Sequence, residues 1–313
     1  MRRFFQNTQD ITMNEIRILI GLFIAIGGHS LFAQQDPQYT QYTYNMNIIN
    51  PAYAGSKGVL SASILGRSQW VGIEGAPRTL TLGLHAPVGK NVGLGLSVIA
   101  DRVGPVSETN VYADFSYTLK TSEESRLALG LKGGFTSLEV GLLNGNDPND
   151  PLNIPIDRTS PNIGVGAYFY TEKFYLGLSA PNLLKTRFLE KTGGIVSTAS
   201  EVVHAFLSTG YVFQIDKDLK FKPSTMIRAN NASPISMDIS GNLLWQNKVE
   251  FGLSYRLNNS FSGILAFMFN ENMRIGYAYD LNITNFGAFS SGSHELMILI
   301  DFNRTSLSSP RFF

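Results

Sequence analysis

The sequence contains no cysteine among its 313 residues, which excludes a disulfide scaffold and a thiolate metal site. Charged residues make up only 16% of the chain, whereas a soluble domain has about a quarter. A formal net charge of +1 provides no basic field for binding nucleic acid. Beyond the N-terminus, no apolar run approaches the roughly 20 residues that a transmembrane helix needs. What remains is a chain with few charges and no helix-length apolar segment.

Short segments in which apolar residues alternate with polar or small ones recur along most of the chain. In residues 249–257 every odd position is apolar, and residues 273–281 repeat the pattern. Because successive strand side chains point to opposite faces, each such segment has one apolar and one polar face. Repeated segments of about ten residues of this kind are typical of a transmembrane β-barrel. The 30 glycines and the 12% aromatic residues also favour a barrel, and a large soluble β-sandwich or propeller is the alternative.

We therefore predict an all-β fold, a transmembrane antiparallel β-barrel of about 14 strands. An even number of strands is the rule for single-chain bacterial barrels. The predicted strands are residues 57–68, 78–87, 91–101, 106–120, 125–138, 161–170, 173–180, 200–214, 218–229, 234–245, 248–257, 260–269, 273–282 and 293–303.

The lengths of the connections predict the orientation of this barrel. If the chain enters the first strand from the periplasm, the odd-numbered connections face outside, and every long connection belongs to that set. The even-numbered connections are all short, as periplasmic turns of outer-membrane barrels are. The eleventh connection, residues 258–259, is short although it lies on the outer side. The pattern predicts a protein of the outer membrane of a Gram-negative bacterium, with outer-membrane lipid around it.

The N-terminus is predicted to be a secretory signal peptide covering residues 1–33. Arg17 precedes an apolar run of about ten residues, and Ala33 provides a small residue at the cleavage site. Either Met1 or Met13 serves as the start. Residues 34–56 are rich in tyrosine, asparagine and turn residues, so we expect a periplasmic segment or a plug within the lumen. The barrel itself would cover residues 57–303, and residues 304–313 would form a periplasmic tail.

Little in the sequence indicates catalysis or cofactor binding. Three histidines outside the signal peptide, His85, His204 and His294, lie on different predicted strands without metal-ligand spacing, and no nucleophile motif occurs. We therefore expect no catalytic residue, no cofactor and no metal. The charges on the predicted inner faces suit a wet or plugged lumen, or a channel or docked segment. They are Arg67, Lys132, Arg228, Glu250, Arg256, Arg274, Asp280, Glu295 and Asp301.

Several short motifs, in a consistent order along the mature chain, resemble the PorP/SprF family of type IX secretion outer-membrane proteins. They are DPQYTQY at residues 36–42, NPAYAG at 50–55, RSQWVG at 67–72, GAPRT at 75–79, DRVGP at 101–105, PNLL at 181–184, GSHEL at 292–296 and PRFF at 310–313. One departure is Ser309, where the family often has cysteine before the final motif. A lipid or thiol function at that position is therefore not expected here.

The resemblance implies a non-enzymatic barrel of the type IX secretion and gliding machinery. Such a barrel would bind and help to present or anchor a large secreted adhesin through the adhesin's C-terminal domain, or dock periplasmic lipoprotein components of the apparatus. The candidate partner-binding residues are Asn50, Pro51, Ala52, Tyr53, Gly55, Arg67, Gln69, Trp70, Pro77, Arg78, His294, Glu295, Arg311, Phe312 and Phe313.

Two other functions are considered beside this one. The first is a diffusion channel of the fatty-acid type, which also uses a barrel of about this size and would suit a charged lumen. The second is a membrane-embedded hydrolase or acyltransferase that uses His204 or His294, since triads are recognised by geometry rather than by sequence position.

Overall fold

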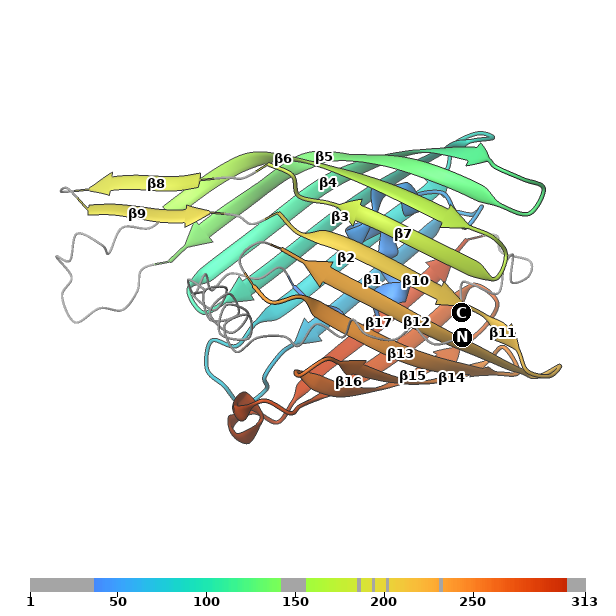
Figure 1. Ribbon diagram of the computed structural model, residues 1–313. Coiled ribbons are helices and arrows are strands. Elements are labelled where there is room, and N and C mark those ends of the chain that lie inside the picture. The colour runs from blue at the N-terminus through green and yellow to red at the C-terminus, as the bar shows by residue number, and fades with distance from the viewer. Residues whose placement is uncertain are drawn as a thin grey trace, which may run out of the picture. The chain divides into compact units, whose positions relative to one another are not determined.

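Fourteen antiparallel strands close into a barrel in the computed structural model (Figure 1). The structure describes residues 37–141, 156–184, 187–192, 195–200, 203–230 and 233–302, with side chains from 185 to 202 not described. The strands of the wall are β1 (Ser61–Ser68), β2 (Arg78–Pro87), β3 (Val92–Val103), β4 (Val106–Lys120), β5 (Arg126–Val140), β6 (Ile156–Tyr170), β7 (Phe174–Ala180), β10 (Ala205–Tyr211), β12 (Leu219–Ala229), β13 (Ser236–Trp245), β14 (Val249–Arg256), β15 (Ser260–Met268), β16 (Met273–Asn282) and β17 (Ser293–Asp301).

The sheet closes because its first and last strands pair. β1 and β17 are antiparallel, with Ser61 opposite Asp301 and Ser68 opposite His294. β10 pairs with both β7 and β12, and the two-residue strand β11 (Phe213–Gln214) extends β10 beside β12. The predicted antiparallel barrel of about 14 strands is confirmed.

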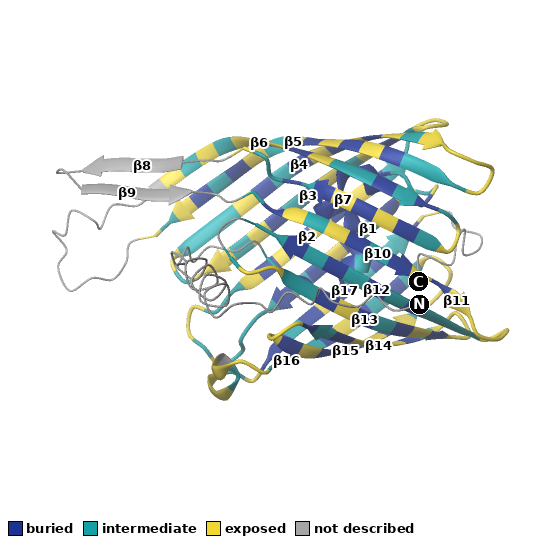
Figure 2. Ribbon diagram, viewed as in Figure 1, coloured by how far each residue is buried: buried dark blue, intermediate teal, exposed yellow. Residues whose placement is uncertain are grey.

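Alternating burial separates the two faces of the wall (Figure 2). Along β2, Leu80 and Leu82 are exposed on the outside, whereas Thr81 and His85 are buried inside. Large exposed apolar side chains follow the same rule on the other wall strands. The apolar outer face can contact lipid, and the polar inner face lines the lumen.

The long and short connections lie at opposite ends of the barrel. The connections after β1, β5, β7 and β16 are long and share one end, here called the long-loop end. The opposite end, the short-turn end, carries only short turns. Exposed aromatic residues gather near it, as expected at a membrane boundary. They are Tyr117, Tyr211, Phe213, Trp245, Phe267, Phe269 and Phe302.

The loop after β7 differs from the prediction. We expected a loop over residues 181–199 and a strand over residues 200–214. Instead, β8 (Arg187–Thr192) and β9 (Ile195–Ser200) pair in a separate two-stranded sheet, and β10 begins only at Ala205. The β-branched residues Ile195, Val196 and Thr198 favour a strand but do not determine which sheet it joins.

Residues 37–58, here called the plug, lie inside the wall rather than in a strand. They form η1 (Tyr42–Tyr44), α2 (Met46–Ile49) and η2 (Pro51–Tyr53), shown in blue within the ring of strands in Figure 1. Most plug residues are buried, and together with inward wall residues such as Tyr168 and Met297 they make the main apolar core. Within the described ranges, no helix is both long and apolar enough to cross a membrane.

The plug runs from one end of the lumen to the other. Pro37 lines a pocket at the long-loop end, whereas Lys57 pairs with Asp301 at the short-turn end. The described part of residues 34–56 thus lies inside the ring of strands. The predicted signal peptide, residues 1–33, and the predicted periplasmic tail, residues 304–313, lie outside the described residues.

Candidate functional site

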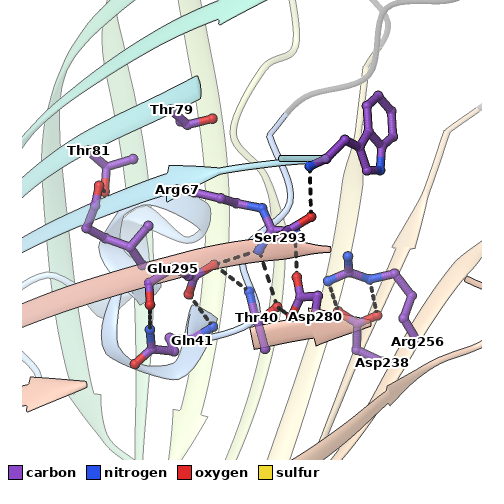
Figure 3. Close-up of polar contacts among 12 residues, drawn as sticks. Thr40, Gln41, Arg67, Thr79, Thr81, Asp238, Arg256, Asp280, Ser293 and Glu295 are labelled. Carbon is purple, nitrogen blue, oxygen red and sulfur yellow. Dashed lines mark hydrogen bonds and ion pairs between the residues drawn. The ribbon is translucent and has the colours of Figure 1, made fainter. Parts of the chain in front are cut away.

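Glu295 on β17 holds the beginning of the plug at the long-loop side of the lumen (Figure 3). Its carboxylate accepts hydrogen bonds from the backbone N–H of Thr40 at 3.0 Å and of Gln41 at 2.7 Å. It also pairs with the guanidinium of Arg67, whose Nη1 lies 3.0 Å away. One carboxylate thus joins the plug to β17 and to β1 at the same time.

Asp280 on β16 completes this cluster. Arg67 Nη2 lies 2.6 Å from its carboxylate, and the Thr40 hydroxyl donates to it at 2.7 Å. Two carboxylates therefore share one guanidinium, and donors from the plug satisfy much of the remaining acceptor capacity. Buried charges are tolerated when they are paired and hydrogen-bonded in this way.

A second cluster holds Tyr44 at the short-turn side. Its hydroxyl donates to Glu250 on β14, and Arg274 on β16 lies 3.2 Å from the same carboxylate. The Arg274 guanidinium stands 4.9 Å from the centroid of the Tyr44 ring, a cation–π contact. Burial, together with the negative charge of Glu250, raises the pKa of Tyr44 well above 10. The phenol therefore stays protonated and donates.

Beyond Tyr44 in the sequence, amide and aromatic groups also connect the plug to the wall. Asn50 accepts from the N–H of Ala52 and donates to the carbonyl of Ala167, each at 3.0 Å. Tyr53 packs edge-on against His85 and Tyr168, with ring centroids 5.3 and 5.4 Å apart. The plug is thus bonded to the wall along its whole described length.

Glycines on the inner face of the wall make room for the plug. A Cβ added at Gly93, Gly130 or Gly166 would lie within 3.0 Å of Ala54, Ala52 or Asn50, closer than real Cβ atoms come. Gly276 on β16 similarly faces the side chain of Gln41. In contrast, a Cβ at Gly133, on the outer face of β5, would meet nothing within 4 Å. These inner glycines are therefore placed where backbone or side-chain atoms of the plug approach the wall closely.

A cavity lies on each side of the plug. The cavity at the long-loop end has an aromatic and aliphatic lining, which includes Tyr39, Ile48, Tyr112, Phe206 and Met226. The cavity at the short-turn end is more polar. Its lining includes Lys57, Lys90, Arg126, Glu124 and Glu172. The plug residues Tyr39 and Lys57 thus contribute to opposite cavities, and the plug lies between them.

Four of the expected partner-binding residues, Asn50, Pro51, Ala52 and Tyr53, are buried in the plug. Their contacts are with the inner wall, so in this conformation they offer no surface to another protein. Gly55 follows them with a positive φ of 74°, a left-handed conformation that suits glycine.

Two other expected residues, Arg67 and Glu295, come together in the cluster described above. They are separated by 228 positions in the sequence, yet both are buried and paired inside the lumen. They too hold the plug to the wall, which is the structural meaning of the RSQWVG and GSHEL motifs at these positions.

The remaining described candidates surround the long-loop end. The N–H of Gln69 donates to the carbonyl of Pro77 at 3.0 Å, and the N–H of Trp70 donates to the Ser293 hydroxyl at 3.2 Å. Arg78 is exposed at the beginning of β2. The candidates Arg311, Phe312 and Phe313 lie outside the described residues.

The histidines lie apart from one another. His204 Nε2 is 2.8 Å from the side-chain nitrogen of Asn230, and His294 faces outwards, with Nδ1 2.6 Å from the Tyr277 hydroxyl. His85 contacts the plug. In the part of the chain that the structure describes, no group of three or more metal-ligating side chains is positioned to hold a metal ion.

The sequence reasoning missed several residues of the plug–wall contact. The sequence did not indicate Tyr44 or Asn45 as contacts of the wall, and it did not indicate Asp114, whose carboxylate lies 2.8 Å from Lys132. The available signal was the inner-face position of Lys132 beside glycine-rich strands. That signal indicates an inward charge, but it does not identify the residue that neutralises it.

Most of this chain matches one known protein family. The family described as type IX secretion system membrane protein PorP/SprF matches residues 31–300. The chain belongs to the PorP/SprF family. It is thus an outer-membrane barrel of a type IX secretion family, and the predicted family and outer-membrane location are confirmed.

Two outer-membrane proteins of known structure are similar to this chain at low identity. The Acinetobacter baumannii outer membrane protein Omp33 is 11% identical, with a TM-score of 0.46, over 78% of this chain and 99% of that one. A Pseudomonas aeruginosa FadL homologue is 12% identical, with a TM-score of 0.44, over 78% of this chain and 89% of that one. A comparison with curated proteins gave no match.

Proposed function

We propose that this PorP/SprF barrel is a non-enzymatic docking protein that binds a large secreted adhesin and helps to present it at the cell surface. The observation that carries the proposal is the plug, which fills the lumen and is bonded to the wall near both ends. Because the plug fills the lumen, a protein partner would bind at the rims of the barrel. The long-loop end faces outside by the general rule for outer-membrane barrels.

The first long loop forms part of a braced surface at that end. Val71 donates to the carbonyl of Gly292 at 2.8 Å, and Ser291 donates back to Val71 at 2.8 Å. Gly104 donates to Gly75 at 2.8 Å, which joins this loop to the turn after β3. A pre-ordered surface loses little conformational entropy when it binds a partner.

Exposed apolar side chains also lie in connections at the long-loop end. Phe289, in η3 (Asn285–Phe289), is 77% exposed, and Ile235 before β13 is 66% exposed. Both lie in connections of the long-loop end, and Ser291 joins the η3 connection to the first loop. Apolar side chains on a braced rim suit the docking of a protein domain. The C-terminal domain of the adhesin is the partner that we propose for this surface.

A specific observation also supports docking of periplasmic lipoprotein components. The polar cavity at the short-turn end is open to the side that would face the periplasm, and Lys57, Arg126 and Glu172 contribute charges of both signs to it. The two surfaces lie at opposite ends, so one barrel can connect a surface protein with the periplasmic apparatus.

The diffusion channel is the function that the plug argues against. Conduction requires a path past Tyr44 and Asn50, and both are buried and hydrogen-bonded to the wall. Planar-bilayer recordings separate the two functions, because we expect wild-type protein to be nearly silent. Open-channel conductance in the wild type would favour the channel.

The docking proposal is tested in cells by replacing Phe289 with Ser and measuring the adhesin on intact cells and in whole lysates. We expect the adhesin to be synthesised but reduced at the surface. Phe302→Ser is the matched control, since Phe302 is 44% exposed at the other end. Normal display in the Phe289 variant and in a deletion strain, with barrel levels verified in the outer-membrane fraction, would contradict the proposal.

A further inference from the structure

A row of polar residues crosses the outer face of five neighbouring strands at the long-loop end. The strand registers place Arg102 opposite Arg78, Arg78 opposite Ser68, Ser68 opposite His294, and His294 opposite Tyr279. Paired residues of antiparallel strands point to the same face, so these five side chains form one continuous row on β3, β2, β1, β17 and β16.

The next outward-facing row towards the middle of the wall is mainly apolar. Two residues along each strand lie Ala100, Leu80, Gly66, Leu296 and Tyr277, in the same order. Leu80 is 56% exposed and Leu296 is 53% exposed, which marks them as lipid-facing. Two residues of strand span only about 7 Å, so the polar row lies at the edge of the apolar belt.

The two arginines of this row are close to each other without an opposite charge between them. Their Cα atoms are directly paired, a separation of about 5 Å in an antiparallel sheet. Both side chains are exposed, and neither forms an ion pair with any described residue. The nearby carboxylate of Asp101 is on the inner face and accepts from Thr79 at 2.6 Å. Like charges directly opposite each other are destabilising unless an anion compensates them.

The rest of the row supplies neutral donors beside the arginines. Ser68 offers a hydroxyl on β1. When the Tyr277 hydroxyl donates to Nδ1 of His294, the proton of the imidazole is on Nε2, where it can be donated outwards. On the other side, Ser107 separates Arg102 from Glu139, where the outer face becomes acidic. The cationic part of the row is thus confined to β2 and β3.

We infer that Arg78 and Arg102, with Ser68 and His294 beside them, bind the phosphate group of a phosphorylated lipid in the leaflet at the long-loop end. Arginine binds phosphate with two parallel N–H···O bonds, and two guanidiniums can hold one group from both sides. The acyl chains of that lipid would then lie along Leu80, Ile64 and Leu296. This site assigns to lipid two residues, Arg78 and His294, that the sequence alone suggested for a protein partner.

The test uses the mature barrel in dodecyl maltoside micelles and measures lipid retention by native mass spectrometry. The probes are dioleoylphosphatidic acid, dioleoylglycerol, which lacks the phosphate, and sodium phosphate, which lacks the acyl chains. For the wild type we expect retention of the phosphatidic acid only. In the double variant Arg78→Gln, Arg102→Gln we expect apparent affinity to fall by about tenfold or more.

The matched control is Lys120→Gln, Arg126→Gln. These cations are also directly paired, but they lie at the short-turn end, where both line the polar cavity. We expect this variant to retain the phosphatidic acid like the wild type. A third variant, Arg78→Lys, keeps the charge without the planar fork and should give intermediate affinity.

Four results would overturn the inference. Undiminished retention by the arginine double variant would show that the phosphate binds elsewhere. An equal loss in the control variant would reveal a general effect of net charge. Equal retention of dioleoylglycerol, or binding of sodium phosphate as tight as that of the lipid, would show that the site does not recognise a lipid phosphate. Heat-modifiability on gels verifies that each variant is folded.

Discussion

Lys132 and Asp114 form an ion pair of 2.8 Å inside the barrel wall, and both side chains are completely buried. The same ammonium group lies 3.3 Å from the carbonyl of Asn47 in the plug. One cation therefore neutralises a wall carboxylate and also contacts the plug. Removing either partner of such a pair leaves the other as an uncompensated buried charge, which lowers the stability of the protein.

We predict that Lys132→Met destabilises the barrel by about 3–5 kcal/mol, because Asp114 is left as an uncompensated buried charge. The measurement is unfolding in urea in detergent micelles. The double variant Lys132→Met, Asp114→Leu should recover most of the loss, since no charge then remains unpaired. Equal instability of the single and double variants would show that the charge itself is not responsible.

A side chain at Gly130 should displace the plug. In Gly130→Leu the new atoms would occupy the position of Ala52, so we expect conductance in planar bilayers where the wild type has little. Gly133→Leu is the matched control because it adds the same side chain on the outer face of the same strand. If the Gly130 variant is folded and inserted but shows no conductance, the inner glycines are not required to make room for the plug.

The Asn50 side chain should be important for local order in the plug. Asn50→Ala removes both the cap on the Ala52 N–H and the bond to the Ala167 carbonyl. A lost cap of this type costs about 1–2 kcal/mol. We expect faster amide exchange in residues 50–55, while exchange in the β1–β17 pair stays unchanged. Uniform acceleration over the whole barrel would instead indicate a global loss of stability.

Alkaline pH should weaken the binding of the plug inside the barrel and lower the stability of the folded protein. Burial raises the pKa of both Tyr42 and Tyr44 above the ordinary value near 10. The folded protein keeps these protons while the unfolded chain releases them, so stability is full below pH 10 and falls as the pH rises further. The Tyr42→Phe, Tyr44→Phe variant should show a shallower fall between about pH 10 and 11.5. Identical slopes would show that other groups control the alkaline loss.

The wall of the barrel could be predicted from the sequence more fully than its contents. The predicted bounds of β2, β4 and β16 agree with the structure because alternation and turn residues are local signals. The nine charges expected on inner faces are all buried. Their partners could not be predicted, because Glu295 meets Thr40 and Gln41 only after the barrel closes.

The plug was recognised as irregular, but its path was not predicted. Its helical turns are too short to give a periodic pattern, and its tyrosines pack against residues such as Tyr168 that are far along the chain. The β8–β9 hairpin was missed for a related reason. Alternation predicts that a segment is a strand, but not which sheet that strand joins.

The contacts of the plug with Asp280 and Glu295 also constrain how the barrel assembles. Thr40 precedes every wall strand in the sequence, yet both carboxylates that it contacts belong to the last two strands. The plug therefore lacks these contacts until β16 and β17 have been synthesised and have joined the sheet. The ion pair of Lys57 with Asp301 lies where the first and last strands pair. This contact of the plug with the wall therefore also forms only when the last strand is in place. Sealing of the wall and filling of the lumen are thus expected to be a single cooperative event, and a chain truncated before β16 should be unable to retain its plug.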